Sequence, residues 1–305
     1  MGLCIYHGGC TDGVAAAWAV WTKHPNWTFY PGVYQQEPPW DLIAIAGEVM
    51  FVDFSYKLPV MRRIAEYDVR LTVIDHHKTA EADLAALFGD DDVVGIFDMD
   101  RCGALLTWDT LWPDAPRPEL LTHIDARDRW IDDPPLHNDA VIIALRSYDH
   151  SPSDDSPAAW DGLMDAWAGF MHLGSERLAD EGVSILRYYR QRVDETKRHA
   201  STFALGEYRD VPLVNAPYYL ASEVAGELAV DAPDKIAAVW WQNKGGDVTF
   251  SLRSRGDVDV GVLATKYGGG GHPGAAGFKV DGLEELIAMQ GRTIQEVAAQ
   301  ARAVS

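Results

Sequence analysis

Residues 69–77 have the sequence Val-Arg-Leu-Thr-Val-Ile-Asp-His-His, in which a β-branched apolar run ends in three polar side chains. Valine, isoleucine and threonine favour strands, and a short run of this kind is typical of a buried strand. We therefore predict a strand over Val69–Ile74. It ends directly before Asp75, His76 and His77, so these side chains are expected at its carboxyl end.

Similar apolar runs lie on both sides of this stretch. Further strands are predicted over Gly2–His7, Val49–Asp53 and Val93–Phe97. Helical spacing separates them, at Gly13–Lys23, Leu58–Tyr67 and Ala80–Phe88. The alternation of short strands with helices predicts an α/β fold whose parallel sheet carries helices on both faces.

The rest of the chain changes character twice. After Cys102 the pattern is mostly helical, and Leu173–His199 predicts one long charged helix. From Thr202 onward strand and helix patterns alternate again. A chain of 305 residues is too long for most single cores. We predict a parallel-sheet N-terminal domain (1–172), a helical connector (173–200) and a smaller α/β C-terminal domain (201–305).

Composition limits the class of partner. The formal charge is −20, whereas proteins that hold long nucleic acids usually carry a basic face. We therefore expect no long duplex partner, although a short oligonucleotide stays compatible. The three cysteines have no zinc-type spacing. No apolar run reaches the roughly 18 residues of a membrane helix, so no membrane partner and a cytoplasmic location are expected.

Potential metal ligands occur at three predicted strand ends. His7 ends the first strand and is followed by Asp12, Asp53 ends the second, and His76 follows the third. One Asp at a strand end is more often a cap or turn residue. Because strand ends of an open parallel sheet meet at one edge, the joint pattern favours a metal site. Imidazoles with carboxylates suit Mn²⁺, Fe²⁺ or Mg²⁺, and two histidines favour manganese. Asp53, on a central strand, is the candidate bridge between two ions.

The same residues carry a family resemblance. Ile74-Asp75-His76-His77 resembles the motif that names the DHH phosphoesterases. Residues 6–13 resemble the family's first motif, Phe51-Val52-Asp53 its second and residues 124–130 its fourth. Residues 268–278 are similar to the glycine-rich motif of the family's C-terminal substrate domain. The motifs follow the family's order along both parts of the chain.

The resemblance implies two metal ions, with Mn²⁺ favoured and Mg²⁺, Fe²⁺ or Zn²⁺ as alternatives. The implied ligands are His7 and Asp53 for one ion, and Asp12, Asp53, His76 and Asp128 for the other. Asp125 is the rival of Asp128. Asp75 is expected to orient His76, and His77 to face the phosphate or the leaving oxygen.

One position departs from the family pattern. The first motif usually has two aspartates separated by one residue, whereas this chain has Cys10-Thr11-Asp12. Thiolates bind manganese poorly and zinc or iron better. The first metal position is therefore expected to be weaker, altered in its metal, or filled only with substrate.

Substrate contacts are expected mainly in the C-terminal domain. The run that includes Gly269, Gly270 and Gly271 leaves backbone N–H groups accessible to an anion. With His272 and the resemblance, it predicts binding of a phosphate or terminal nucleotide. Arg253 is a candidate for bidentate phosphate contacts, with a solvated surface charge as the alternative. Arg101 opens a segment, Arg101–Ala104, that resembles one lying by the metals in the family.

These patterns favour an enzyme. The predicted activity is that of a metal-dependent exonuclease of the oligoribonuclease kind, hydrolysing short single-stranded oligonucleotides to nucleoside monophosphates. A phosphoadenosine-phosphate phosphatase and a cyclic or linear dinucleotide phosphodiesterase are the alternatives. From another class, a nucleotide-binding module with an impaired metal site stays open, as does the choice between monomer and dimer.

Overall fold

The computed structural model describes residues 1–34, 36–88, 92–131, 133–152, 156–282, 284–285 and 288. The chain divides into two compact units, Met1–Arg187 and Tyr188–Ser305. The division falls inside helix α9 (Ser175–Lys197), so one helix carries the chain from the first unit into the second. The predicted domain limits at 172 and 200 stay predictions.

The first unit is built on a parallel sheet. Its strands are β1 (Gly2–His7), β2 (Thr28–Gly32), β3 (Glu48–Val52), β4 (Arg70–Asp75) and β5 (Val93–Phe97). Their order is β2-β1-β3-β4-β5, and every neighbouring pair is parallel. The predicted parallel-sheet α/β fold is thus confirmed, although the sequence did not predict β2.

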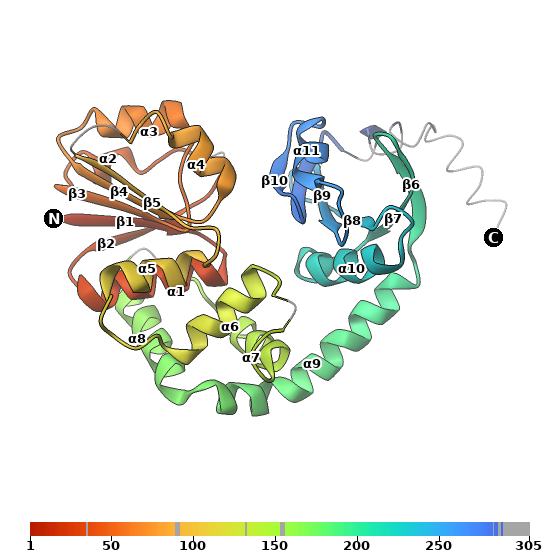
Figure 1. The fold of residues 1–305 in the computed structure, drawn as a ribbon, viewed down its shortest axis with the longest axis horizontal. Helices are drawn as coiled ribbons and strands as arrows, with labels where there is room; N and C mark the ends of the chain where they lie inside the picture. The colour runs from red at the N-terminus through yellow and green to blue at the C-terminus, as the bar shows by residue number, and fades with distance from the viewer. Residues whose placement is uncertain are drawn as a thin grey trace. The chain divides into compact units, whose positions relative to one another are not determined.

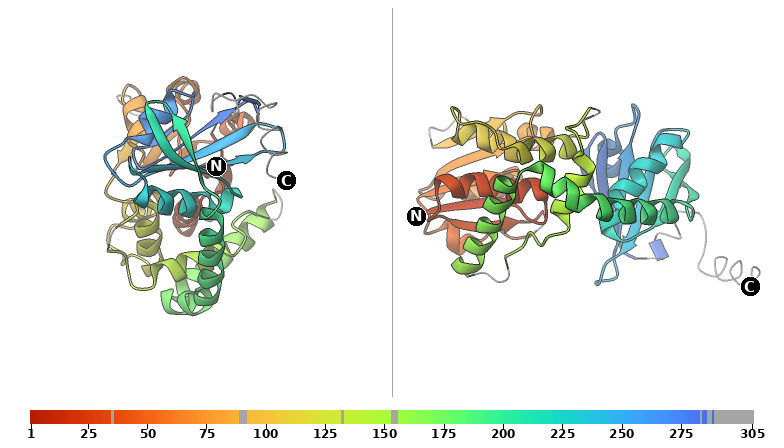
Figure 2. Two further views of the ribbon diagram at one scale, coloured as in Figure 1. Left: turned by 90° about the vertical axis from the view of Figure 1, so that its right-hand side faces the viewer. Right: turned by 90° about the horizontal axis from the view of Figure 1, so that it is seen from below.

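Helices cover both faces of this sheet (Figure 1). They are α1 (Thr11–Lys23), α2 (Trp40–Ile43), α3 (Leu58–Ala65), α4 (Lys78–Leu84), α5 (Gly103–Leu111), α6 (Glu119–Asp128), α7 (Asn138–Arg146) and α8 (Pro157–Leu173). Helices α2, α3 and α4 lie on one face, and α1 and α5 on the other. Helices α6 and α8 extend the second layer, because both pack against α1. Figure 2 shows the same ribbon from two other directions.

Alternation along the strands explains the two layers. In β1, Leu3 and Ile5 belong to the core beneath α2, α3 and α4, whereas Cys4 and Tyr6 belong to the core beneath α1 and α5. All four are at most 1% exposed. Successive strand residues point to opposite faces, so a strand buried on both faces must be apolar throughout. This is why the strands appear as unbroken apolar runs in the sequence.

The strand order creates one topological switch point. The chain leaves β1 for β2 in one direction and returns to β3 on the other side of β1. The order therefore reverses between β1 and β3. In open parallel sheets, ligands bind outside the carboxyl ends of the strands at such a point. Those ends are His7 in β1 and Val52 in β3.

The second unit is a mixed sheet. Its strands are β6 (Ser201–Leu205), β7 (Tyr208–Asn215), β8 (Ile236–Gln242), β9 (Val248–Ser254), β10 (Gly270–His272) and β11 (Ala275–Val280). The order is β10-β11-β9-β8-β7-β6, with only the β7–β8 pair parallel among the described strands. Helices α10 (Tyr218–Asp231) and α11 (Val260–Thr265) pack on it through separate apolar cores.

Two features of this unit go beyond the sequence prediction. Strand β6 was not expected, and part of the glycine run is the edge strand β10. Among the residues that the structure describes, no helix is long and apolar enough to cross a membrane.

Candidate metal centre

The strand ends of the first unit bring the predicted ligands together. His7 ends β1, Asp53 follows β3, and His76 follows β4. Helices supply two more, since Asp12 lies in the first turn of α1 and Asp128 ends α6. Five residues from five elements thus converge beside the switch point.

Distances define two groups that share one carboxylate. His76 Nε2 lies 3.2 Å from Asp53 Oδ1, 3.5 Å from Asp128 Oδ2 and 3.7 Å from Asp12 Oδ2. On the other side, His7 Nδ1 lies 3.4 Å from Asp53 Oδ2. The two oxygens of Asp53 therefore face two different histidines, as a carboxylate that bridges two cations would.

Three sets of side chains have potential ligand atoms within 4.8 Å of one another. They are His7, Cys10 and Asp53; Asp12, His76 and Asp128; and Asp53, Asp75, His76 and His77. The first two sets match the two groups defined by the distances.

Two glycines allow the helix ends to approach the strand ends. A Cβ on Gly13 would lie 2.2 Å from His7 O, and a Cβ on Gly103 would lie 2.4 Å from Asp53 Cβ. Real Cβ atoms do not come this close, so larger residues would push α1 and α5 away. The side chains of Asp12 and Asp53 can lie close together because residues 13 and 103 are glycines.

Asp12 also caps a helix that is distant in sequence. Its Oδ2 accepts a hydrogen bond from Gly103 N at 2.7 Å, and its Oδ1 accepts one from Ala104 N at 2.9 Å. These N–H groups at the start of α5 have no partner within the helix. Asp12 is 2% exposed, so it is fixed in place before any ligand binds. The predicted proximity of residues 101–104 to the site is explained by these bonds.

Asp53 has an uncommon backbone conformation. Its φ is +54°, in the left-handed region that few side chains other than Asn and Asp enter readily. Its N–H donates to Ile74 O at 3.0 Å, which continues the pairing of β3 with β4 by one residue. The chain turns at Asp53 immediately afterwards, and the carboxylate points to the site.

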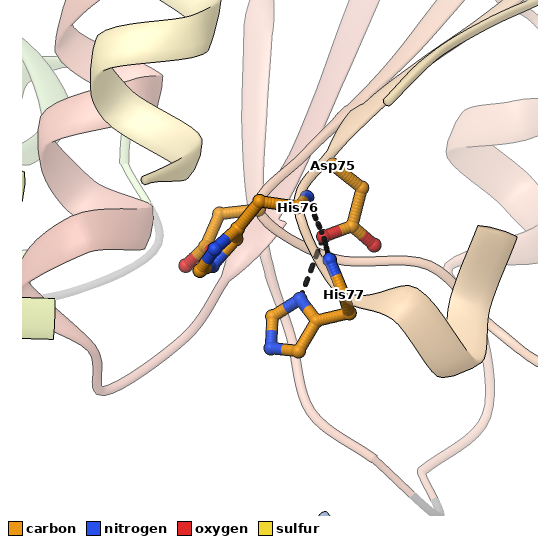
Figure 3. Close-up of side chains that lie close together, drawn as sticks. Asp75, His76 and His77 are labelled. Carbon is orange, nitrogen blue, oxygen red and sulfur yellow. Dashed lines mark hydrogen bonds and ion pairs between the residues drawn. The ribbon is translucent and has the colours of Figure 1, made fainter. Parts of the chain in front are cut away.

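Asp75 organises the histidine pair (Figure 3). Its Oδ1 accepts hydrogen bonds from His76 N at 2.8 Å and His77 N at 3.2 Å, and lies 2.6 Å from His77 Nδ1. Asp75 is completely buried. In the close-up, the rings of His76 and His77 lie near each other, with centroids 4.6 Å apart. Asp75 thus positions the ring of His77 directly and His76 through its backbone.

Asp53 and the two histidines beside it shift one another's pKa values in opposite directions. Burial on its own raises the pKa of Asp53, but the imidazoles of His7 and His76 outweigh burial and hold this pKa below its usual range. For His76, burial lowers the pKa, yet Asp53 and its neighbours raise it to about 10. The pKa of His7 is raised in the same way. Asp53 is therefore an ionised carboxylate in a buried position.

The remaining acids show a surplus of negative charge. Burial, followed by the charges of Asp53 and Asp128, raises the pKa of Asp12 well above its usual value. Burial also raises the pKa of Asp128, and burial with nearby carboxylates raises that of the Cys10 thiol. A divalent cation would reverse these shifts, because it favours the deprotonated form of each ligand. The donor set therefore fits a metal ion.

A buried oxygen supports the same fit. Asp53 Oδ2 has no hydrogen-bond partner among the described residues, and its contact with His7 is long. Buried polar atoms are almost always paired, since leaving one unpaired costs about 1–3 kcal/mol. A cation beside this oxygen would supply the missing partner.

Two predicted residues lie in other arrangements. Asp125 Oδ1 accepts from Cys102 N at 2.6 Å, and its Oδ2 lies 3.3 Å from Arg129 Nη1. It belongs to none of the ligand sets found in the described part of the chain, so the geometry favours Asp128 over Asp125. Arg101 donates to Asp98 and Asp109, each at 2.8 Å. Its role towards substrate stays a prediction.

The sequence did not predict that aromatic side chains lie beside His7. The ring of Tyr34 lies 5.4 Å from that of His7 and 4.9 Å from that of Phe54. Tyr34 is 44% exposed. A lone tyrosine after a short strand carries no pattern, so no sequence feature pointed to it.

In the second unit, the strand register aligns two predicted substrate residues. His272 pairs with Ala275, and Ala275 pairs with Arg253. Residues in one cross-strand row share a face of the sheet. The Arg253 guanidinium donates to Ser222 Oγ in α10 at 3.0 Å and to Leu252 O at 2.8 Å. His272 and Arg253 therefore lie on the face that carries α10.

The glycine run forms a tightly packed edge. A Cβ on Gly269 would lie 2.1 Å from Gly277 O, and one on Gly271, whose φ is +145°, would lie 2.6 Å from Ala275 O. At Gly270, no atom of the described residues lies within 4 Å of the corresponding position. Two of the three predicted glycines are thus required by close packing, and Gly270 has open space beside it.

Several known proteins resemble this chain in sequence or in fold. Residues 218–300 match the DHHA1 domain family. The chain is 27% identical, over 310 aligned residues, to uncharacterized protein R106 of Acanthamoeba polyphaga mimivirus. That alignment covers 93% of this chain and 68% of R106.

Solved structures also resemble the chain. RecJ from Thermus thermophilus, solved in complex with Mn²⁺, matches with a TM-score of 0.53 and 15% identity, covering 98% of this chain and 52% of RecJ. The pGpG-specific phosphodiesterase PggH from Vibrio matches with a TM-score of 0.44 and 14% identity, over 99% of this chain and 96% of PggH. The likeness to RecJ shows a shared fold. The DHHA1 match over residues 218–300 and the fold shared with RecJ are both in line with the predicted resemblance to the DHH phosphoesterases.

Proposed function

We propose that the chain is a two-metal phosphodiesterase that hydrolyses short single-stranded oligonucleotides to nucleoside monophosphates. The position of Asp53 carries the proposal, because its two oxygens lie 3.2 Å from His76 and 3.4 Å from His7. A carboxylate shared in this way suits two ions held close together, which is the arrangement that phosphoester hydrolysis uses.

The assignment of ligands follows the two groups. His7 and Asp53 would hold one ion, and Asp12, Asp53, His76 and Asp128 the other. Imidazole and carboxylate ligands suit Mn²⁺, and RecJ was solved with that ion. Bound divalent ions would supply polarisation of the phosphoryl group and activation of the nucleophile.

The protein's own groups position the reaction. Asp75 Oδ1 lies 2.6 Å from His77 Nδ1, and we assign the ring proton to that nitrogen because a carboxylate can only accept it. We assign the opposite nitrogen, Nε2, to the scissile phosphate or the leaving oxygen. Asp75 is buried and accepts two backbone N–H bonds as well, so its orientation does not depend on substrate.

Substrate class follows from local and overall charge. Arg253, held by Ser222 and Leu252, presents a guanidinium beside the row that contains His272. This pair would bind one phosphate of a nucleotide. A net charge of −20 disfavours long nucleic acids, which bind through many phosphate contacts. A short oligonucleotide requires only a few such contacts.

The test is release of mononucleotide from labelled dinucleotides to pentanucleotides, of both RNA and DNA, with added Mn²⁺. We expect hydrolysis by the wild type that is lost in Asp53→Ala and His76→Ala and upon chelation. Asp68→Asn is the matched control, since Asp68 is an exposed carboxylate that precedes β4.

Absence of hydrolysis by metal-loaded wild type would reject the oligonucleotide assignment. Phosphoadenosine phosphate and cyclic dinucleotides are then the substrates to assay, in that order. Binding of nucleotides without hydrolysis of any of them would instead identify a binding module.

A further inference from the structure

Cys10 lies where one of the two metal positions is built. It is the residue before helix α1 and is half-buried. A ligand atom of Cys10 lies within 4.8 Å of ligand atoms of His7 and Asp53. Its thiol is thus grouped with an imidazole and a carboxylate, and both of these are assigned above to the same ion.

A second observation points to a cation in this group. Asp53 Oδ2, the oxygen on the His7 side, has no hydrogen-bond partner among the described residues. The Asp53 side chain is only 2% exposed. A buried carboxylate oxygen without a hydrogen-bond partner is a position where a cation can bind. Because the Cys10 thiol, the His7 ring and this carboxylate offer ligand atoms within 4.8 Å of one another, one ion could contact all three.

We infer that Cys10 is a ligand of the ion held by His7 and Asp53, so that this position prefers Zn²⁺ or Fe²⁺ to Mn²⁺. The inference rests on the proposed two-metal function and names the metal chemistry of one of its positions. Thiolate ligands favour zinc and iron, whereas carboxylates favour manganese and magnesium.

The other group provides a contrast within the same site. Asp12, His76 and Asp128 offer nitrogen and oxygen only. Two adjacent positions with different ligand chemistry would hold two different metals. The chain is then expected to bind one zinc-like and one manganese-like ion, rather than two equivalent ions.

The backbone at Cys10 makes the inference testable by substitution. Its φ of −116° and ψ of 134° are those of extended backbone, which any residue adopts. Its carbonyl accepts the first bond of α1, from Val14 N at 3.1 Å. Cys10→Asp, Cys10→Ser and Cys10→Ala therefore leave the main-chain contacts in place.

The experiment loads the full chain with Co²⁺ and records its absorption spectrum. A thiolate bound to cobalt gives an intense near-ultraviolet charge-transfer band that nitrogen and oxygen ligands do not give. We expect this band in the wild type and in Cys4→Ala, where a thiol in the β1 core has been removed. We expect it to be absent in all three Cys10 variants.

Metal selectivity gives a second readout that does not depend on activity. The ratio of Zn²⁺ to Mn²⁺ affinity, measured by competition at equilibrium, is expected to fall at least about tenfold in Cys10→Asp. Thermal unfolding of each variant in the absence of metal checks that the fold is retained.

The outcomes separate this inference from the proposed function. If two Co²⁺ ions bind and His76→Ala weakens binding, but the wild type lacks the band, the thiolate assignment is wrong and the two-metal site stands. A band that persists in Cys10→Ala also overturns the assignment. If no ion binds to the wild type, both fail together.

Discussion

The two units place their candidate residues in different ways. In the first, carboxylates and imidazoles from five elements contact one another at the carboxyl ends of parallel strands, and Asp12 and Asp53 are at most 2% exposed. In the second, Arg253 and His272 are half-buried and lie along one row of a largely antiparallel sheet, and Arg253 contacts α10 through Ser222.

The difference indicates two tasks. Concentrated buried charge is costly unless a cation compensates it, so the first unit fits chemistry on a metal-bound group. A half-buried guanidinium held by a hydroxyl and a carbonyl carries no such concentration of charge, which agrees with the substrate binding proposed for the second unit. Substitutions in the first unit should therefore affect turnover and metal affinity, and those in the second should affect substrate affinity.

The largest effect is expected for Asp53→Asn. This change keeps the shape of the side chain and its tolerance of positive φ, but removes the charge shared by both histidine groups. We expect kcat to fall by about 10³-fold or more, which is about 4 kcal/mol, together with weaker metal binding. Kinetics and equilibrium dialysis measure the two effects. Near-normal turnover in this variant would contradict the two-task comparison.

The second-largest effect is expected for Gly103→Ala. The new Cβ would lie 2.4 Å from Asp53 Cβ, so either α5 or the carboxylate must move. We expect a loss of about 1–3 kcal/mol in the free energy of unfolding and a weakened metal site. Gly162→Ala in α8 is the matched control, because nothing lies within 4 Å of its added Cβ. Denaturant unfolding measures both variants, and equal stability of the two would refute the steric argument.

Arg253→Ala should separate binding from turnover. We expect KM for an oligonucleotide to rise about 10-fold to 100-fold, as for loss of a charged hydrogen bond of about 1.5–3 kcal/mol, with metal affinity unchanged. Arg209→Ala, an exposed arginine on β7, is the control. A fall in kcat with unchanged KM would assign Arg253 to the reaction rather than to binding.

Asp75→Asn tests how far His77 depends on its partner. The amide oxygen can still accept the backbone bonds, but the charge beside His77 Nδ1 is lost. Partners of this kind typically contribute about 10–100-fold to activity or metal affinity, and we expect an effect near the lower limit, mainly on kcat. An unchanged kcat would show that the orientation of His77 is not used.

The smallest effect is expected for Asp109, the carboxylate that pairs with Arg101 and Arg117. Burial raises the pKa of Asp109, but Arg117 and Arg101 outweigh burial and lower this pKa below its usual value. A carboxyl whose pKa is lowered in the folded state stabilises the fold at pH values above its pKa in the unfolded state, which is near 4. This stability is lost as the pH falls through the pKa of the folded state. Asp109→Asn should therefore cost about 1 kcal/mol at neutral pH and progressively less below pH 4. Asp114→Asn, which is exposed, is the control for the pH series.

The sequence predicted most of the first sheet because its strands are buried on both faces. Strand β5 was placed with the right limits, and β4 was displaced by one residue. Strand β2 was not predicted because it ends in Pro31 and Gly32, which are poor strand formers. Such a strand is tolerated at the sheet edge, where β2 lies.

The candidate site shows the same limit. The strand-end residues could be predicted because parallel topology alone brings them to one edge. The cap that Asp12 forms on α5 could not, since the contact joins residues about 90 positions apart and depends on the lack of a side chain at Gly103. Neither could the preference for Asp128 over Asp125, because both lie on α6 and only packing determines which one faces His76.

The contrasting backbones of Asp53 and Cys10 determine where this site can be redesigned. At Asp53, φ of +54° restricts the choice to residues that tolerate the left-handed region, and glutamate, the other carboxylate, does so poorly. At Cys10 the extended backbone accepts any side chain. Metal preference could therefore be tuned by exchanging one residue at the start of α1, while the shared carboxylate that any pair of metals would need stays unchanged.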